Sequence, residues 1–365
     1  MERISQSQLA ALIIMFQIGS TPLFLLGKDA GADAWIAVLI AMAAGLLLLL
    51  LTLCIHRLEP GKELMEIMNT YFGKYIGYVF GIAYFIYFSY QSVRNLREFG
   101  DLTNLYLLPR TPLPVLIGCL LLVAGYAVWH GIEVFGRITQ ILLPGICAMY
   151  GAFLIAIYAT GLFDLHRIEP FLDHGVMKVI DAALPEVLLF PFGEMVLFLM
   201  FWKFADRKKH TFRTTALSYA GTGCFIILTN LFIAASLGPI AQISVAPFIQ
   251  LVSQIQFASF VERLDPFVAA LLFTGVFIKL TAYFFGAAFI GRHLVKADQR
   301  YIVVSVGVIL LVGSLWFRSF MQHIWIGFEY NLKYHFPVFQ IYLPALILIV
   351  MLLRSQLRAN GSRRS

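Results

Sequence analysis

The stretch Phe16-Gln17-Ile18-Gly19-Ser20-Thr21-Pro22-Leu23 decides the fold, because it interrupts the long apolar run Leu9–Leu26 near its middle. Glycine loosens a helix, and proline removes a backbone donor and clashes with the preceding turn. Unpaired backbone at membrane depth survives only where protein or a water-filled cavity receives it. The stretch therefore predicts a discontinuous helix that lines a site.

A second interruption lies in the run Leu184–Trp202, at Phe190-Pro191-Phe192-Gly193-Glu194-Met195. The two interruptions occupy corresponding positions in two halves of five apolar runs each. Interrupted spans in corresponding positions are the best sequence indication of a transporter binding site. The alternative is a pair of ordinary proline kinks, which membrane helices tolerate.

The composition favours a polytopic membrane protein. Hydrophobic residues make up 60% of the chain and charged residues 13%, whereas soluble domains average about 45–50% and about 25%. This excess fits helices that are apolar all round because lipid surrounds them. The net charge of +7 does not indicate nucleic-acid binding, since the basic residues lie in short loops between apolar runs.

Ten runs are long enough to cross a bilayer, which needs about 20 mostly apolar residues per helix. Residues 1–365 are thus expected to form a single transmembrane domain with repeat one at about 9–160 and repeat two at about 184–353. The runs are Leu9–Leu26, Asp33–Ile55, Ile76–Phe99, Leu113–Trp129, Phe135–Thr160, Leu184–Trp202, Thr215–Leu237, Pro266–Ile290, Ile302–Phe317 and Phe336–Leu353.

The distribution of Lys and Arg between the runs predicts the topology. With the N-terminus in the cytoplasm, the cytoplasmic side receives about twice as many of the 27 basic residues as the other side, as the positive-inside rule requires. Both termini are then cytoplasmic, and residues 354–365 form a cytoplasmic tail.

Two non-cytoplasmic loops are longer than a turn. Phe163–Ala183 mixes apolar and charged residues, which is typical of an interfacial helix. Pro239–Asp265 carries apolar residues at helical spacing with Ser and Gln between them. This second loop is either a lid over a cavity or a helix resting on the membrane surface.

The interruptions and the deepest charges predict the binding residues. The half-helix that begins near Ser20 would direct the amides and hydroxyls of Ser20 and Thr21 at an anionic ligand group. Glu194, after the second break, would contact a ligand amine or carry a proton. Lys279, in the eighth run, would replace a coupling cation. The alternative is a structural pair of Glu194 with Lys279, or Lys279 bonded to opened backbone carbonyls.

A polar and aromatic stripe follows one face of the third run. Tyr84, Tyr87, Gln91 and Arg94 share that face, and on a lipid-facing surface their hydrogen-bonding groups would be wasted. Tyr84 and Tyr87 are deep enough to line a cavity. The alternative is hydrogen bonding between helices together with an aromatic belt.

Other features carry no chemistry. The cysteines lie singly inside apolar runs, and the eight histidines form no HxxxH or HExxH pattern, so we expect no metal, no catalytic residues and no cofactor. Gly73, Gly77 and Gly81 are spaced four apart, which permits close helix contact.

Several motifs, in order, resemble the B subunits of bacterial spore-germination receptors, permease-like proteins of the amino acid/polyamine/organocation superfamily. The motifs are Ile4-Ser5-x-x-Gln8, Gly131-Ile132-Glu133-Val134-Phe135-Gly136-Arg137, Pro191-Phe192-Gly193-Glu194, Phe260-Val261-Glu262-Arg263-Leu264-Asp265 and Gly275-Val276-Phe277-Ile278-Lys279.

The resemblance implies an all-α fold of ten transmembrane helices in a five-plus-five inverted repeat (LeuT-like), with discontinuous helices 1 and 6. It also implies the inner membrane of a dormant spore, an A subunit and a C lipoprotein subunit as partners, and a small-molecule germinant such as an amino acid as ligand. Permeases of this superfamily carry Gly-x-Gly in the first break. Here the side chains of Ser20 and Thr21 narrow the room for a carboxylate, which leaves sugars, nucleosides or ions open.

The leading hypothesis is a ligand-sensing subunit that is not an enzyme. Its predicted ligand-binding residues are Gly19, Ser20, Thr21, Tyr84, Tyr87, Phe192, Gly193 and Glu194, with Lys279 as a substitute for a cation. The first alternative is an amino acid permease, coupled to protons through Glu194 or uncoupled. The second is a structural scaffold, which leaves the paired breaks and buried charges unexplained.

Overall fold

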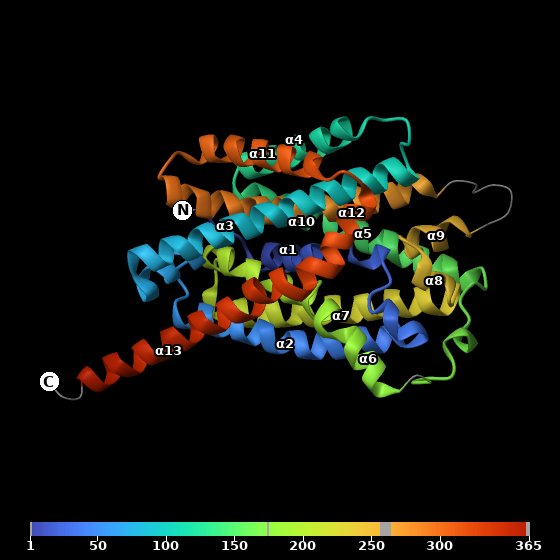
Figure 1. The fold of residues 1–365 in the computed structure, drawn as a ribbon, viewed down its shortest axis with the longest axis horizontal. Helices are drawn as coiled ribbons and strands as arrows, with labels where there is room; N and C mark the ends of the chain where they lie inside the picture. The colour runs from blue at the N-terminus through green and yellow to red at the C-terminus, as the bar shows by residue number, and fades with distance from the viewer. Residues whose placement is uncertain (1, 174, 256–263, 363–365) are drawn as a thin grey trace.

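The computed structural model describes residues 2–173, 175–255 and 264–362. Within these ranges the chain is helical and forms no strand, apart from an isolated bridge between Ile4 and Ala205. The long helices run side by side along one direction, and both termini lie toward the same end of the bundle (Figure 1). Residues 260–263 of the motif before the eighth run, and part of the predicted lid, lie outside the described residues.

The described chain up to Ala159 contains seven helical elements. They are α1 (Gln6–Ile18), η1 (Thr21–Leu23), η2 (Lys28–Asp33), α2 (Ala34–Leu58), α3 (Leu64–Tyr106), α4 (Leu113–Trp129) and α5 (Ile132–Ala159).

The described chain from Leu165 onward contains more short elements. They are η3 (Leu165–Ile168), α6 (Val176–Ala182), η4 (Ala183–Val187), η5 (Phe192–Met200), η6 (Trp202–Phe204), α7 (Lys208–Leu237), α8 (Ile240–Ile243), α9 (Pro247–Ser253), α10 (Asp265–Val295), α11 (Gln299–Trp316), α12 (Phe320–Trp325), η8 (Ile326–His335), η9 (Val338–Tyr342) and α13 (Leu343–Ser362).

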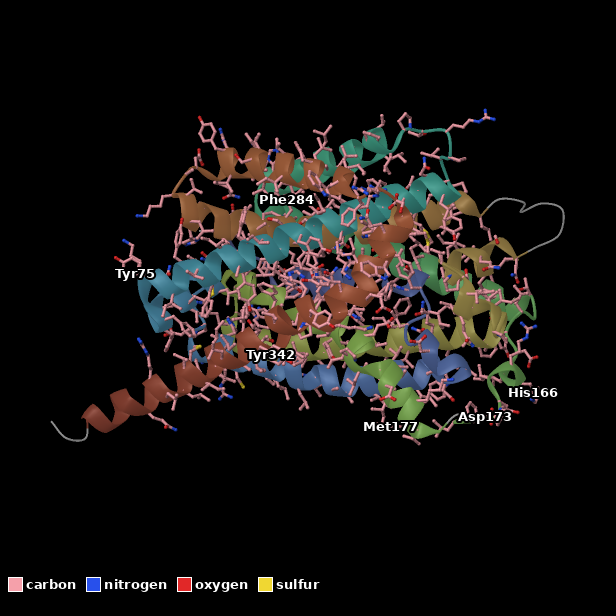
Figure 2. The ribbon with its side chains drawn as sticks, viewed as in Figure 1. Tyr75, His166, Asp173, Met177, Phe284 and Tyr342 are labelled. Atoms are coloured by element: carbon pink, nitrogen blue, oxygen red, sulfur yellow. The ribbon has the colours of Figure 1, made fainter. Side chains whose placement is uncertain are left out.

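The two ends of the bundle differ in what they carry. The end with both termini and the connection between α2 and α3, here called the terminal end, also carries Tyr75 (Figure 2). The opposite end, here called the loop end, carries η3, α8 and α9, and Figure 2 places His166, Asp173 and Met177 there.

Helix α1 lies at the centre of the bundle, where it packs against α5, α7 and α10. Its start is fixed by a capping box: Ser5 Oγ accepts from the Gln8 amide at 3.2 Å, and Gln8 Oε1 accepts from the Ser5 amide at 2.9 Å. Such reciprocal caps satisfy two donors that a helix start leaves free. This explains why Ser5 and Gln8 precede the first apolar run.

Helix α3 packs along α10, which is the most extensive helix contact among the described residues. Gly73 has φ 80°, a left-handed backbone that glycine adopts without steric cost, and it folds the start of α3 back on the rest. A Cβ on Gly77 would lie 2.5 Å from Asn69 Oδ1, and one on Gly81 would lie 2.5 Å from Met65 Sδ. The predicted close contact is confirmed, although the main partner is the first segment of α3 itself.

Seven helical segments of the described chain are long and apolar enough to cross a membrane, so this is an all-helical, multi-pass membrane protein. They are Lys28–Leu58, Ile132–Ala159, Val176–Met200, Lys208–Leu237, Pro266–Val295, Gln299–Trp316 and Phe320–Gln356. The other three predicted runs correspond to α1, which is only 13 residues long, to the charged α3, and to α4, an apolar helix of 17 residues. Ten crossings and the inverted repeat stay predictions.

The last span differs most from its predicted limits. Its helix begins at Phe320 rather than Phe336, and it continues through Ser362, where a tail was expected. Two stretches of wider π-type turns, Ile326–His335 and Val338–Tyr342, lie inside it. Wider turns of this kind often occur at functional sites.

The two long loops contain short helices, as predicted. In the first loop Phe171 and Val176 are exposed. In the second, the apolar face of α9 is buried against protein, since the Phe248 ring lies 5.5 Å from that of Tyr150 and 6.1 Å from that of Phe153.

Candidate functional site

A buried ion pair joins the second break to α10. Lys279 Nζ lies 2.6 Å from Glu194 Oε2, and the two side chains are 1% and 3% exposed. Tyr283, one turn after Lys279, donates its hydroxyl to Glu194 Oε1 at 2.8 Å. A buried charge without a partner is strongly destabilising, whereas an opposite charge at this distance offsets the cost of burial. The predicted alternative of a Glu194–Lys279 pair is therefore present in the structure.

Aromatic rings surround the ammonium of Lys279. Nζ lies 4.1 Å from the centroid of the Phe190 ring and 5.8 Å from that of Phe16. The negative faces of aromatic rings attract cations, and they do so more strongly where water is excluded. Together with Glu194, the two rings hold the ammonium beside both breaks.

The first break touches α10 directly. Gly19 ends α1 with φ 40°, and its carbonyl oxygen would clash with a Cβ on Gly275. Only a glycine at position 275 permits this approach, because the clash would be with backbone. A Cβ on Gly19 would also come within 3.0 Å of Lys279 Cδ. The break is therefore held against the helix that carries Lys279.

Buried polar groups at the first break lack partners. The amide of Gln17 and the hydroxyl of Thr21 form no hydrogen bond with any described residue, although both residues are 0% exposed. The Ser20 hydroxyl lies beside Glu98 without completing a hydrogen bond of good geometry. Polar groups buried in this way are rare unless a ligand or water completes them.

The second break is closed by helix η9. A Cβ on Gly193 would clash with Gln340 Oε1, so the Gln340 side chain would have to move if another residue stood at this position. Gln340 in turn donates from Nε2 to the Tyr87 hydroxyl at 2.8 Å. Phe192 is buried, and its ring packs at a tilt of 57° against that of Tyr219, with centroids 5.5 Å apart.

Tyr84 and Tyr87 lie inside the helix packing rather than on a cavity wall. The Tyr84 hydroxyl donates to the Phe339 carbonyl at 3.0 Å, and the Tyr87 hydroxyl accepts from Gln340 and, at 3.2 Å, from Gln91. Both tyrosines are 0% exposed. Their position matches the alternative of hydrogen bonding between helices, and ligand contact by them stays a prediction.

A cavity of about 240 Å³ extends from Glu194 to the surface of the loop end. Of the predicted ligand-binding residues, only Glu194 lines it; Gln91 and Arg94 of the predicted stripe line it too. Residues Ala241–Val245 of the predicted lid form part of its mouth. The cavity therefore lies on the loop-end side of both breaks.

Several polar residues of the cavity wall were missed by sequence reasoning. Glu98 continues the spacing of the predicted stripe by one more turn beyond Arg94, so the pattern contained that signal. Glu186 and His323 also line the wall. Neither belongs to a recognisable motif, because only the packing of α12 on α3 and of η4 on α2 and η8 brings them to the cavity.

The terminal end is closed by ion pairs. Lys203 Nζ lies 3.1 Å from Glu63 Oε2 and 3.7 Å from Glu66 Oε2, and His293 Nε2 lies 3.0 Å from Glu63 Oε1. Glu63, Glu66 and His293 are close enough together to hold a metal ion. The Lys203 ammonium, however, already supplies a positive charge at both carboxylates.

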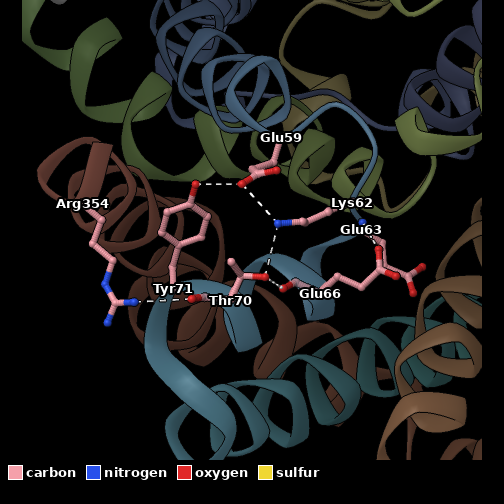
Figure 3. A network of polar contacts seen from close by, with 7 residues as sticks. All are labelled: Glu59, Lys62, Glu63, Glu66, Thr70, Tyr71 and Arg354. Carbon is pink, nitrogen blue, oxygen red and sulfur yellow. Dashed lines mark hydrogen bonds and ion pairs between the residues drawn. The ribbon is translucent and has the colours of Figure 1, made fainter. Parts of the chain in front are cut away.

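The acidity of Glu63 reflects these partners. Burial alone favours the neutral carboxyl, but the hydrogen bond with His293 and the positive charge of Lys203 outweigh it and hold the pKa of Glu63 below its ordinary 4.5. A neighbouring network links the last helix to α3 (Figure 3), where Arg354 donates to the Thr70 carbonyl at 3.4 Å and Tyr71 donates to Glu59 at 2.8 Å.

Residues 2–6, here called the N-terminal strap, also close the terminal end. The Ile4 amide donates to the Phe204 carbonyl at 2.9 Å, and the Ile4 carbonyl accepts from the Asp206 amide at 3.0 Å. Glu2 accepts from the Ile132 amide at 3.1 Å. The strap thus fastens the start of α1 to the end of η6 and to the first residue of α5.

The comparisons with known proteins agree with this architecture. Residues 3–322 match the model of the spore permease family, described as spore germination protein. The chain belongs to the spore germination protein family. It is 30% identical to spore germination protein KB of Bacillus subtilis (strain 168) over 364 residues, which cover 98% of this chain and 97% of that protein.

More distant relatives come from the same organism. Spore germination protein A2 is 23% identical over 288 residues, covering 78% of this chain and 77% of that protein. Spore germination protein YndE is 21% identical over 242 residues, covering 64% and 65%. The predicted family is confirmed, and with it a germination-related membrane subunit of the permease type.

Proposed function

We propose that this chain is the solute-binding subunit of a spore germination receptor. It binds a small polar germinant in the cavity beside Glu194 and passes the signal to an A subunit and a C lipoprotein. It spans the spore inner membrane ten times, as a five-plus-five inverted repeat with both termini cytoplasmic. The observation that carries the proposal is the 240 Å³ cavity, which ends at the buried Glu194–Lys279 pair between the two breaks.

Signalling requires that the ligand bind one conformation better than the other. The unpartnered polar groups of Gln17 and Thr21 support this, because closure around a solute would bring partners to them. The pair of Glu194 and Lys279 lies against both breaks, so a solute that attracts either charge shifts the contact between α10 and η5. The fold thereby links occupancy of the cavity to the packing of the two halves.

An amino acid permease, proton-coupled or uncoupled, is the second candidate. Its support is a second hollow of about 630 Å³ at the terminal end, lined by Glu2, Glu63, Lys203 and Arg292 among others. A transporter needs access from both sides of the membrane, and hollows at both ends are what alternating access would use.

One experiment separates the two candidates. Purified protein is reconstituted in sealed proteoliposomes, with and without a pH gradient, and binding and uptake of labelled amino acids, sugars and nucleosides are followed. Saturable binding without uptake supports the receptor subunit. Uptake, above all if driven by the pH gradient, supports the permease, and the absence of any binding contradicts both.

The role of Glu194 is tested in the same assay. We expect Glu194→Gln to weaken solute binding while the protein stays in the membrane. Because that change leaves Lys279 without its partner, the double variant Glu194→Gln/Lys279→Met is the matched control for disrupted packing. Full binding by Glu194→Gln would contradict the proposed role.

A further inference from the structure

Helix α3 carries two arginines that are each followed, one turn later, by an acidic residue, but only one of the two combinations forms an ion pair. Arg97 and Asp101 form an ion pair of 2.7 Å, as an Arg and an acid one turn apart usually do. Arg94 and Glu98 are also one turn apart, yet no ion pair joins them in the described structure. Instead both side chains line the cavity, where each is partly exposed.

The guanidinium of Arg94 is fixed in place without an acidic partner. It lies 5.7 Å from the centroid of the Phe336 ring, and its Nη2 lies so close to Gly327 that a Cβ there would clash. Its Nε is buried and bonded to no described residue. An arginine held by packing alone presents its planar fork to whatever enters the cavity, and that fork matches a carboxylate with two parallel hydrogen bonds.

His323, on α12, provides an independent observation at the same cavity. Its side chain is 1% exposed, it lines the cavity, and neither ring nitrogen has a partner among the described residues. Buried imidazole nitrogens normally find hydrogen-bond partners. The unsatisfied ring therefore indicates that this part of the cavity is built to receive a polar group.

The acidic side of the cavity lies next to the first break. Glu98 Oε1 is buried without a hydrogen bond of good geometry, and the Ser20 hydroxyl lies beside this carboxyl. The remaining charges around the cavity are Lys28 and Glu186 of its wall and Glu194, which is already paired with Lys279. Among the charges that line the cavity, Arg94 and Glu98 are thus a cation and an anion one turn apart on α3, and no ion pair of the described residues contains either of them.

We propose that Arg94, Glu98 and His323 form a recognition subsite for a zwitterionic solute, on the loop-end side of the breaks. The carboxylate of the solute pairs with Arg94 and accepts from His323, and its ammonium group pairs with Glu98. Because Glu98 lies beside Ser20, an occupied subsite contacts the first break. The inference rests on the proposed function and adds the ligand chemistry and the residues that select it.

The test uses the full chain in proteoliposomes and analogues that differ by one charge. The probes are the twenty proteinogenic amino acids and, for each that binds, its carboxamide and its N-acetyl derivative. With the unaltered protein we expect each neutralised analogue to bind at least about tenfold more weakly than the amino acid, roughly the cost of losing one charged hydrogen bond.

Variants assign each loss to a residue. Arg94→Gln should weaken amino acid binding about tenfold or more and remove the preference for acid over carboxamide, while Glu98→Gln should remove the preference over the N-acetyl derivative. Arg94→Lys keeps the positive charge but lacks the planar guanidinium, so its affinity for amino acids should lie between those of the unaltered protein and Arg94→Gln. Arg110→Gln, an exposed arginine at the loop end, is the control for net charge and should bind normally.

The outcomes separate the subsite from the proposed function. Carboxamides that bind the unaltered protein as tightly as the acids, or Arg94→Gln with unchanged affinity, would overturn the subsite and leave the proposed function standing. Binding of sugars alone would do the same. Absence of binding by every probe and by the wider solute panel would overturn both. The comparison of each amino acid with its carboxamide uses the unaltered protein. The subsite can therefore be tested even if Arg94→Gln does not fold.

Discussion

The two ends of the bundle place similar residues in opposite situations. At the terminal end Glu63, Lys203 and His293 are joined within 3.1 Å, and the N-terminal strap adds backbone hydrogen bonds across α1 and η6. At the loop end Arg94 and His323 face a cavity without a partner among the described residues. The difference teaches that the charged groups of the terminal end pair with one another, whereas Arg94 and Glu98 form no ion pair with a described residue at the cavity of the loop end.

Substitutions in the central Glu194–Lys279 ion pair, where the two ends meet, should have the largest effect on stability. Removing one partner of a buried ion pair costs about 3–5 kcal/mol, so Glu194→Gln should lower the melting temperature of detergent-purified protein strongly. Glu194→Gln/Lys279→Met removes both charges and should recover part of the loss. A double variant that is less stable than Glu194→Gln would show that the charges are not coupled.

The second-largest effect on stability is expected from a variant that loosens the N-terminal strap at the terminal end. Ile4→Pro removes the amide that donates to the Phe204 carbonyl, which costs about 1–3 kcal/mol by leaving that acceptor unpaired. We expect a cysteine placed at Ala205 to react faster with a water-soluble maleimide in this variant. The labelling is measured in a variant in which alanine replaces the four exposed cysteines, Cys54, Cys119, Cys147 and Cys224.

Unchanged labelling of that cysteine in Ile4→Pro would mean that the strap does not hold the terminal end closed. Ile4→Val keeps the amide and the apolar side chain, and serves as the matched control.

Acidification should weaken the terminal end. The folded pKa of Glu63 is below its ordinary 4.5, so its contribution to stability is present above that pH and is lost as pH falls through the folded pKa. The melting temperature should therefore fall more steeply below about pH 4.5 in the unaltered protein than in Glu63→Gln. Glu169→Gln, at an exposed position of the loop end, should follow the unaltered protein.

The smallest effect on stability is expected from a substitution at the loop end, at His323. His323→Phe removes two unsatisfied ring nitrogens from a buried site, and replacing an unpaired buried polar group by an apolar one is close to neutral or stabilising. We expect the melting temperature without solute to stay within about 2 °C or to rise. A large fall would show that His323 has a structural role rather than a role in the subsite.

The sequence predicted the fold class because apolar length and loop charge act locally. Each of the ten predicted runs coincides with helical segments, and Gly19 interrupts the first of them with a left-handed backbone, as its position indicated. The pairing of Glu194 with Lys279 was one of two alternatives, since both charges had to face the interior.

The cavity wall was less predictable, because it depends on contacts between distant segments. Gln340, Glu186 and His323 reach the site only through the packing of η4, α12 and η9, and no local pattern marks them. Tyr84 and Tyr87 share a helix face with Arg94, yet the first two are covered by η9 and the third faces the cavity. The spacing along a helix predicts which residues share a face. Which of these residues line a cavity depends on the element that packs against that face.

The last helix links these regions mechanically. From Phe320 to Ser362 it is helical almost without interruption; its first turns line the cavity, Gln340 contacts Gly193 and Tyr87, and α13 projects from the terminal end (Figure 1). The 20 residues of α13 form a rod of about 30 Å, so a tilt of about 10° at Gln340 would displace its tip by about 5 Å. A small adjustment at the cavity would thus be amplified into a larger displacement at the far end of α13.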